Sequence, residues 1–232
     1  MYDLIIDPGH GGKDPGGGGN ASWVEKVMVL AISLYQLERF KALGVNVGIT
    51  RDKDTTLAPS ERIAMIKQSK VCISNHTNAG GGDGAETIHS IYSKGVLATE
   101  IAEQIKKDGQ NIRRVFTRVL PYNPKRDYYY LHRDSGATEV VIVEYGFADS
   151  NLDDVQQIIK YWKYYAEAVV EAYCKVYGVK YIPNEFTLIE PEWCKILRSS
   201  VDMPNEWIDW INDQSGIGKF LPVLIEKVSK SK

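Results

Sequence analysis

Short apolar runs alternate with amphipathic segments along most of this 232-residue chain. The apolar runs have the length of buried strands, and the amphipathic segments repeat their apolar residues at helical spacing. Strands are expected at residues 3–7, 45–50, 71–75, 86–92 and 140–143, and helices at 25–42, 59–68, 96–108 and 152–177. Residues 110–138 are polar, rich in Arg and Tyr, and fit neither pattern. Strands that alternate with helices predict an α/β fold with a mostly parallel sheet.

The alternating pattern breaks near residues 178–183. We therefore expect a main domain at residues 1–179 and a small, mostly helical C-terminal domain at residues 183–232. The second segment carries three of the five tryptophans of the chain. About 50 residues are marginal for folding alone, so this segment is expected to be an appendage of the main domain.

Composition and charge exclude several classes of protein. Lys and Arg number 28 against 30 Asp and Glu, so no global positive field would attract nucleic acid. No apolar run approaches the ~20 residues that span a bilayer, and no membrane insertion is expected. The N-terminus has neither the basic nor the apolar region of a secretion signal, which predicts synthesis in the cytoplasm. Three cysteines without C-x-x-C spacing argue against a disulfide framework.

Glycine is concentrated in two segments, each beside one of only four histidines. Seven of the 20 glycines lie at residues 9–19, around His10, and four lie at residues 80–84, close to His76. His10, His76 and Glu144 each follow the last residues of an expected strand. Because functional groups in such sheets collect beyond the carboxyl ends of the strands, we expect these three side chains to lie at one edge.

His10, Glu25 and His76 are a candidate ligand set for zinc. Catalytic zinc usually takes three protein ligands from imidazole and carboxylate groups and leaves one position for water. Glu144 would then accept the proton of the zinc-activated water and pass it to the leaving amine.

Each of these residues also has a simpler explanation. A histidine after a strand is most often structural, and Ser22-x-x-Glu25 matches a capping box, which the local pattern favours for Glu25. Glu144 could pair with Arg51 or Arg62 in a buried network. The glycine-rich segments could bind phosphate, although neither matches a phosphate-binding motif.

The other two histidines have weaker signals. His89 lies on a strand face with Thr87 and Ile91, and a structural role is expected. His132 lies in the polar segment before the last strand and is a candidate contact for the substrate.

Four motifs follow one another in an order and at distances typical of a known family. They are DPGHGGKDPG at 7–16, Glu25-Lys26, ISNHTN at 73–78 and VVIVEYGFADS at 140–150. Smaller matches are Thr50-Arg51 with Asp52, Arg62, and Gly84-Ala85-Glu86. Over roughly residues 1–177 the chain resembles the zinc-dependent N-acetylmuramoyl-L-alanine amidases of the type 3 family.

The resemblance implies a twisted mixed sheet flanked by helices and Zn²⁺ as the cofactor. It also implies His10, Glu25 and His76 as zinc ligands, which favours the ligand over the cap for Glu25, and Glu144 as the catalytic glutamate. The implied reaction is hydrolysis of the peptidoglycan amide between N-acetylmuramic acid and L-alanine of the stem peptide, which lyses the bacterial cell wall. A zinc peptidase that cuts within the stem peptide and a non-catalytic wall-binding protein are the alternatives.

Some features depart from the family or lie outside the resemblance. Asn75 and Thr77 flank His76 where the family usually has a small residue and alanine, which affects the substrate detail expected rather than the activity. Without a predicted secretion signal, we expect a phage endolysin that acts on the wall after release through a holin-type pore. Residues 183–232 are then a candidate wall-binding module, although packing of their tryptophans in a small core of their own is the favoured explanation. A monomer is expected.

Overall fold

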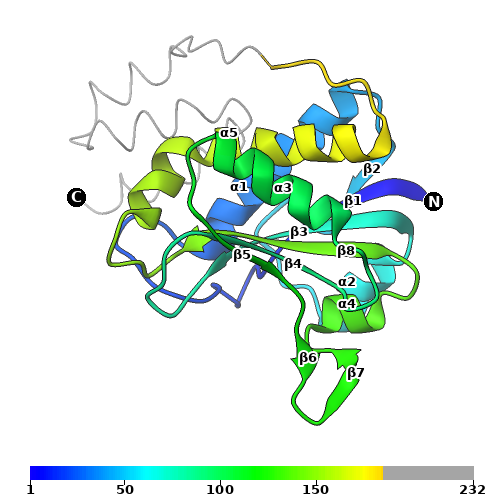
Figure 1. Cartoon of the computed structure of the whole chain (residues 1–232), viewed down its shortest axis with the longest axis horizontal. Helices are drawn as coiled ribbons and strands as arrows, with labels where there is room; N and C mark the ends of the chain where they lie inside the picture. The colour runs from blue at the N-terminus through cyan, green and yellow to red at the C-terminus, as the bar shows by residue number, and fades with distance from the viewer. Residues whose placement is uncertain (185–232) are drawn as a thin grey trace. The chain divides into compact units, whose positions relative to one another are not determined.

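The computed structural model describes residues 1–184, which contain a six-stranded sheet with helices on both faces (Figure 1). The strand order is β2-β1-β3-β8-β4-β5. Strands β2, β1, β3 and β8 are parallel, whereas β4 runs antiparallel to β8 and pairs in parallel with β5. The strands are β1 (Tyr2–Pro8), β2 (Val47–Ile49), β3 (Ser69–Asn78), β4 (Ala85–His89), β5 (Ile112–Phe116) and β8 (Glu139–Phe147). The α/β fold with a mostly parallel, mixed sheet is confirmed.

Three long helices cover one face of the sheet, and two short helices cover the other (Figure 1). The long helices are α1 (Glu25–Ala42), α3 (Val96–Lys107) and α5 (Asp154–Tyr177); the short ones are α2 (Pro59–Ile66) and α4 (Tyr130–Asp134). Helix α1 has the predicted bounds. The other long helices begin and end within two residues of the predicted positions.

Strand alternation decides which side chains enter each core. Ile5 and Ile142 point to the face covered by α2 and α4, where they pack with Leu131. The neighbouring strand residues Ile6 and Val143 are fully buried on the opposite face, because successive side chains of a strand alternate. Each such side chain contributes about 1.5–3 kcal/mol when it is fully buried, and the two cores hold the sheet between its helices.

Two strands extend further than the sequence predicts. β3 continues to Asn78 and β8 continues to Phe147, so His76 and Glu144 lie within strands rather than just after them. The ladder between β3 and β8 pairs these two residues directly, and the antiparallel partner β4 continues the pairing on the other side of Glu144. The strands continue to these residues because they pair with neighbouring strands, and the local sequence pattern does not reveal this pairing.

The segment that fits neither pattern in the sequence is ordered by its neighbours. It contains β5, the short strands β6 (Val119–Leu120) and β7 (Asn123–Asp127), and α4. β6 and β7 form a separate two-stranded hairpin, and β5 is an edge strand. Because nearly all side chains of β5 and β7 are exposed or half-buried, these strands lack the apolar alternation by which strands are usually found.

Residues Met1–Ile182 form one compact unit. The predicted C-terminal domain at 183–232 lies outside the described residues except for positions 183 and 184, so its helical structure stays a prediction. Within residues 1–184, no helix combines the length and the apolar character needed to cross a membrane.

Candidate metal centre and active site

One face of the sheet changes from apolar to polar toward the carboxyl ends of β3 and β8. Ile142 belongs to the apolar core under α2 and α4. Glu144 lies two residues further along the same strand and therefore on the same face. It is in register with His76 of β3 on one side and with Glu86 of β4 on the other. Three polar residues thus form a row across three neighbouring strands.

A cavity of about 490 Å³ opens over His76 and Glu144 of this row. Its lining includes His10, Glu25, His76 and Glu144, the four residues singled out from the sequence. The structure therefore brings these four side chains together, and three of them, His10, His76 and Glu144, are the ones expected at one edge of the sheet.

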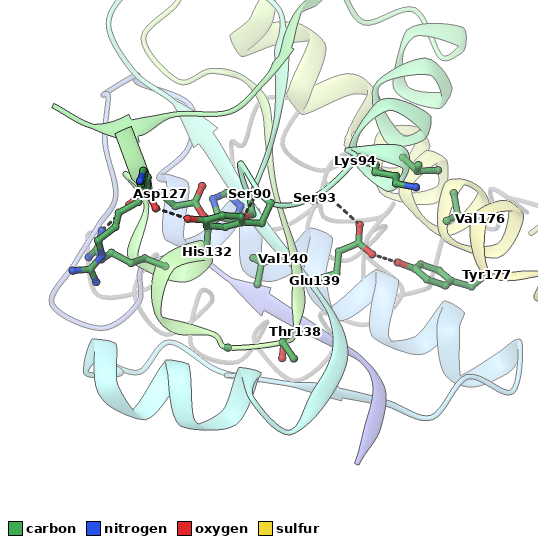
Figure 2. Close-up of a pocket in the computed structure, with 17 residues that line it drawn as sticks. Ser90, Ser93, Lys94, Asp127, His132, Thr138, Glu139, Val140, Val176 and Tyr177 are labelled. Carbon is green, nitrogen blue, oxygen red and sulfur yellow. Dashed lines mark hydrogen bonds between the residues drawn. The ribbon is translucent and has the colours of Figure 1, made fainter. Parts of the chain in front are cut away.

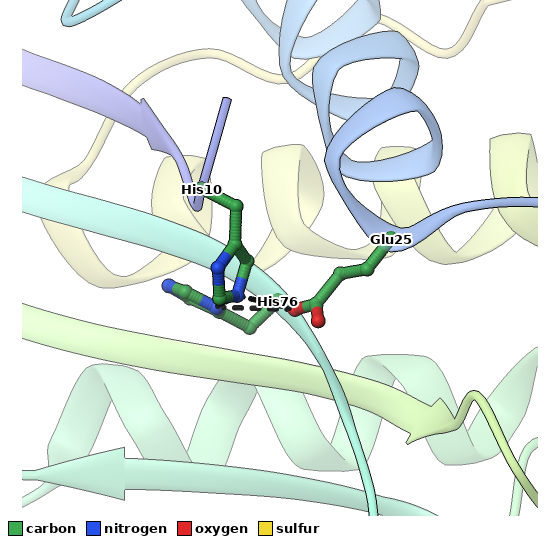
Figure 3. A group of neighbouring side chains, drawn as sticks. All are labelled: His10, Glu25 and His76. Carbon is green, nitrogen blue, oxygen red and sulfur yellow. Dashed lines mark hydrogen bonds and ion pairs between the residues drawn. The ribbon is translucent and has the colours of Figure 1, made fainter. Parts of the chain in front are cut away.

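His10, Glu25 and His76 converge on one point (Figure 3). The Nε2 atom of His10 lies 3.0 Å from Oε1 of Glu25. The Nδ1 atom of His76 lies 3.2 Å from Nε2 of His10 and 3.3 Å from the same carboxylate oxygen. The three side chains come from the loop after β1, the first residue of α1 and the interior of β3. Three donor atoms of types that bind metals therefore form a nearly equilateral triangle.

Two buried arginines hold the backbone that carries His10. Arg62 donates to the carbonyl oxygens of Pro8 at 2.8 Å and of His10 at 3.0 Å. Arg51 donates to the carbonyl oxygen of Gly9 at 2.7 Å. His10 itself has a φ of 58°, a left-handed conformation that is uncommon outside glycine. At this turn the backbone carbonyls bind guanidinium groups in place of a neighbouring strand. These hydrogen bonds fix the backbone and thereby the direction of the His10 imidazole.

The charge of Arg62 is balanced by Asp7, whose side chain is fully buried and in contact with it. Asp7 also accepts hydrogen bonds from Thr50 at 2.6 Å and from Ser74 at 2.7 Å. Removing one member of a buried ion pair typically costs about 3–5 kcal/mol, because the other charge is left uncompensated. The pair therefore ties β1, β2, β3 and α2 together beneath the site.

The carboxylate of Glu25 is held by backbone N–H groups. Gly17 donates to Oε2 at 2.7 Å, and Thr77 donates to Oε1 at 2.9 Å. Gly16 packs against this side chain with a φ of 97°, and a Cβ at this position would lie 2.4 Å from Oε2. A glycine is required at Gly16 both by the backbone conformation and by the lack of space.

Glu25 does not form the predicted capping box. The cap position of α1 is Val24, without a side-chain hydrogen bond. The side chain of Asn20 accepts hydrogen bonds from the backbone of Ser22 and Trp23, both at 2.8 Å. The backbone N–H groups before the helix therefore have another partner, and the cap interpretation of Glu25 is wrong.

The charges of the centre stabilise one another. Burial alone would lower the pKa of His10, but hydrogen bonds and charges of Glu25 and Asp14 outweigh it and raise the pKa to about 9. Burial alone would raise the pKa of Glu25, but the hydrogen bonds from His10 and His76 outweigh it and lower the pKa to about 2. Glu25 is therefore an anion at neutral pH in a site that binds positive charge, either a proton or a metal cation.

Glu144 lies beside this centre without a counter-charge of its own. The residue is half-buried, but its Oε2 atom is shielded from solvent and has no hydrogen-bond partner among the described residues. Burial raises its pKa to about 7. Arg51 and Arg62 bind backbone carbonyls and Asp7 instead, so the alternative of a buried network with Glu144 is wrong. A buried carboxylate with a free oxygen and a pKa near neutrality has the properties of a general base.

His132 lies in a different cavity. This second cavity, of about 720 Å³, is lined by His132, Ser90, Asp127 and Glu139 among others (Figure 2). His132 is 8% exposed, and burial lowers its pKa to about 4. Contact between His132 and substrate stays a prediction that this position does not favour. His89 lies 3.0 Å from the Ser90 carbonyl oxygen, an interaction typical of a structural residue.

Several residues at the site were not identified as functional from the sequence. Glu86 is 2% exposed and accepts a hydrogen bond from Asn78, which lines the catalytic cavity. Asp14 lies 2.9 Å from Nδ1 of His10. Tyr129 lines the cavity from the segment before α4. The only sequence signal for Glu86 was its place in Gly84-Ala85-Glu86; Asp14 lay within a recognised motif without a role.

The fold and the site define an α/β protein with a candidate metal centre of two histidines and one carboxylate, next to a glutamate with a solvent-shielded, unpartnered oxygen. Residues 4–175 match the Amidase_3 family, described as N-acetylmuramoyl-L-alanine amidase, and the chain belongs to this family.

Individual relatives agree with the family match. The chain is 32% identical over 112 residues to the N-acetylmuramoyl-L-alanine amidase AmiC of Neisseria meningitidis serogroup B, covering 47% of this chain and 26% of that protein. It is 30% identical over 124 residues to the sporulation-specific N-acetylmuramoyl-L-alanine amidase of Bacillus subtilis, covering 46% and 48%. The crystal structure of an N-acetylmuramoyl-L-alanine amidase from Clostridium difficile 630 superposes with a TM-score of 0.66 at 25% identity, covering 78% of this chain and 98% of that one. The aligned part is about a quarter to a half of the two curated relatives.

Proposed function

We propose that this protein is a peptidoglycan hydrolase that cleaves the amide between N-acetylmuramic acid and L-alanine of the stem peptide. The observation that carries the proposal is the convergence of His10, Glu25 and His76 on one point beside the buried carboxylate of Glu144. Membership of the N-acetylmuramoyl-L-alanine amidase family supports the choice of bond.

We also propose Zn²⁺ as the cofactor, held by the same three side chains. Their donor atoms lie 3.0 to 3.3 Å apart. Ligand atoms at about 2.0–2.1 Å from a tetrahedral zinc are about 3.3–3.4 Å apart, so the donors fit the ion with only a small outward shift. Asp14 accepts a hydrogen bond from Nδ1 of His10, which directs the lone pair of Nε2 toward the centre. When bound, zinc supplies a Lewis acid that lowers the pKa of water and polarises a substrate carbonyl.

Glu144 moves the proton in this proposal. Its unpartnered oxygen accepts a proton from the attacking water, and the resulting carboxylic acid donates that proton to the leaving nitrogen of L-alanine. A pKa of about 7 suits both steps, since the group is then neither too weak a base nor too weak an acid. The buried row of the sheet keeps bulk water away from the carboxylate, so the proton stays between it and the substrate.

Mass spectrometry of digested peptidoglycan tests the reaction. The purified full chain with added zinc is expected to release stem peptides that begin with an intact L-alanine and to leave unmodified N-acetylmuramic acid on the glycan. A zinc peptidase would instead leave L-alanine on the glycan and release shorter peptides. A non-catalytic wall-binding protein would release nothing. Either of these two products would contradict the amidase proposal.

We further propose that residues 183–232 bind the bacterial cell wall, as their three tryptophans suggest. Fused to a fluorescent protein, residues 180–232 are expected to pellet with purified walls, and a fusion in which Trp193, Trp207 and Trp210 are replaced by alanine serves as control. A fusion that stays in the supernatant would contradict wall binding. Phage origin, holin-type release and the monomeric state stay predictions from the sequence.

A further inference from the structure

Three arginines, Arg113, Arg114 and Arg118, lie beside the lining of the catalytic cavity, on the side of β5. We call this group the arginine wall. Arg113 and Arg114 are both in contact with the buried carboxylate of Glu86, the last member of the polar row that contains Glu144. Their side chains are 45% and 49% exposed, so each also faces solvent. Arg113 and Arg114 are therefore anchored to the row and half exposed to solvent, and Glu86 in turn binds Asn78 of the cavity lining.

A β-bulge places two arginines on one glutamate. In the pairing of β4 with β5, Ala85 is opposite Ile112, but Glu86 is opposite Arg114, and the register shifts between them. Arg113 is the extra residue. Without the bulge, neighbouring strand residues would point to opposite faces. Bulges re-aim side chains in this way and are frequent next to active sites.

Aromatic rings fix the guanidinium groups. The Cζ atom of Arg114 lies 3.9 Å from the ring centroid of Phe116, and that of Arg118 lies 3.9 Å from the ring centroid of Tyr128. Stacking on a ring restricts a guanidinium group but leaves its N–H edge available. Arg118 also acts on Tyr129 of the catalytic cavity: burial raises the pKa of that phenol, and the arginine partly opposes the rise. Arg118 therefore lies next to the cavity lining.

The charges of this wall exceed what the protein itself neutralises. Arg113 and Arg114 share the single carboxylate of Glu86, which accepts from Arg114 at 2.9 and 3.3 Å and from Arg113 through one amino group. Arg118 has no ion pair with any described residue. A substrate with a carboxylate beyond the cleaved bond would be attracted by the wall.

The spacing suits a peptide. The guanidinium groups of Arg113 and Arg114 contact Glu86 of β4, and β4 lies two strands from β3, which carries His76, or about 10 Å at the usual strand separation. An extended peptide advances about 3.3–3.6 Å per residue, so a side-chain or backbone carboxylate on the second or third residue of a stem peptide reaches the wall when the first amide lies at the metal centre.

We propose that the arginine wall binds a free carboxylate of the stem peptide and thereby selects substrates that carry one. This inference rests on the proposed amidase function and assigns Arg113, Arg114 and Arg118 as specificity-determining residues. The ligand is an anionic N-acetylmuramoyl peptide. A peptide whose carboxylate is replaced by a carboxamide loses the charge that the wall recognises.

The arginine wall is tested separately from turnover by measuring how peptides bind to the full-length, zinc-loaded Glu144→Gln variant. Two probes are compared by calorimetry: an N-acetylmuramoyl peptide with a free carboxylate on its second residue, and the same peptide with a carboxamide there. The carboxylate form is expected to bind about tenfold more tightly. This factor corresponds to the lower end of the free-energy range for a hydrogen bond to a charged group, as suits a half-exposed site. Arg118→Gln and Arg113→Gln, each added to this variant, are expected to reduce the preference several-fold.

Arg126→Gln is the matched control, because Arg126 is an exposed arginine of the neighbouring hairpin that lines the other cavity. The preference for the carboxylate form should survive this change. Equal affinities for the two peptides, including no binding of either, would overturn the proposed carboxylate recognition. A preference that Arg118→Gln and Arg113→Gln leave intact would also overturn it. So would an equal loss of preference in the Arg126→Gln control. The proposed function fails separately: the Glu144→Gln variant could prefer the carboxylate peptide while the parent protein releases no L-alanine-terminated peptide. That result would contradict the amidase activity and not the arginine wall.

Discussion

The Glu144→Gln variant is expected to retain zinc and to lose turnover by a factor of about 10²–10⁴, the usual contribution of a general acid–base residue. Glutamine has nearly the same shape as glutamate but cannot accept a proton from water. The contacts among His10, Glu25 and His76 do not involve Glu144, so the metal centre should persist in this variant. Release of L-alanine-terminated peptide per unit time, measured together with zinc content, checks both parts.

Glu139→Gln is a suitable control for Glu144→Gln. Glu139 begins the same strand, but its carboxylate contacts Ser93 and Tyr177 at the other cavity, far along β8 from the metal centre. Its replacement should leave turnover within about twofold, as for most surface changes away from a site. Near-normal wall lysis by the Glu144→Gln variant would remove Glu144 from the mechanism.

The burial of the Glu144 carboxylate also predicts how the activity of the parent protein depends on pH. Glu144 works as a base only when ionised, so kcat/KM should fall as the pH drops through the pKa of this group, which burial raises to about 7. A bound cation nearby moves this limb to lower pH. The Glu144→Gln variant should lack the limb in its residual activity.

The raised pKa of Glu144 also affects stability. In the metal-free protein, folding favours the protonated form, so stability falls as the pH rises from the ordinary glutamate pKa through about 7. The Glu144→Gln variant lacks this loss, and its melting temperature at pH 8 should equal or exceed that of the parent. A site that costs stability and is kept is typical of a functional group.

The sequence predicted the helices and the polar residues of the site well because both have local signals. Helix α1 shows its apolar spacing and its closing glycine within 20 residues, and His10 and His76 stand in short motifs. The role of Glu25 was ambiguous because the cap and the ligand differ only in long-range contacts. The N–H groups of Gly17 and Thr77 that bind its carboxylate are eight and 52 residues away.

The arginine wall could not be predicted for a related reason. Arg113 and Arg114 lie in an exposed edge strand without apolar alternation, and the bulge that aims both at Glu86 exists only in the pairing with β4. The buried pair of Asp7 and Arg62 was likewise hidden, because 55 residues separate its members. Interactions between distant strands and helices decide these features, and a single sequence does not display them.

His10→Ala is expected to lower zinc affinity more than a hundredfold and to abolish turnover. Replacement of a group that only orients a ligand typically costs about 10–100-fold in metal affinity, so removal of a ligand should cost more. The two donors that remain, from Glu25 and His76, are 3.3 Å apart and cannot close a three-ligand site. Zinc content after dialysis against a weak chelator, measured by atomic emission, gives the affinity.

Two control variants separate ligation from folding in this experiment. Asp14→Asn keeps all three donors but weakens the hydrogen bond that orients His10, so its zinc affinity should fall between those of the parent and of His10→Ala. His89→Ala removes a histidine outside the catalytic cavity and should keep full zinc occupancy. Since the carbonyls of the His10 loop are held by Arg51 and Arg62 rather than by the imidazole, His10→Ala should remain folded by circular dichroism. Full zinc occupancy in a folded His10→Ala protein would rule out His10 as a ligand, and with it the centre on which the proposed function depends.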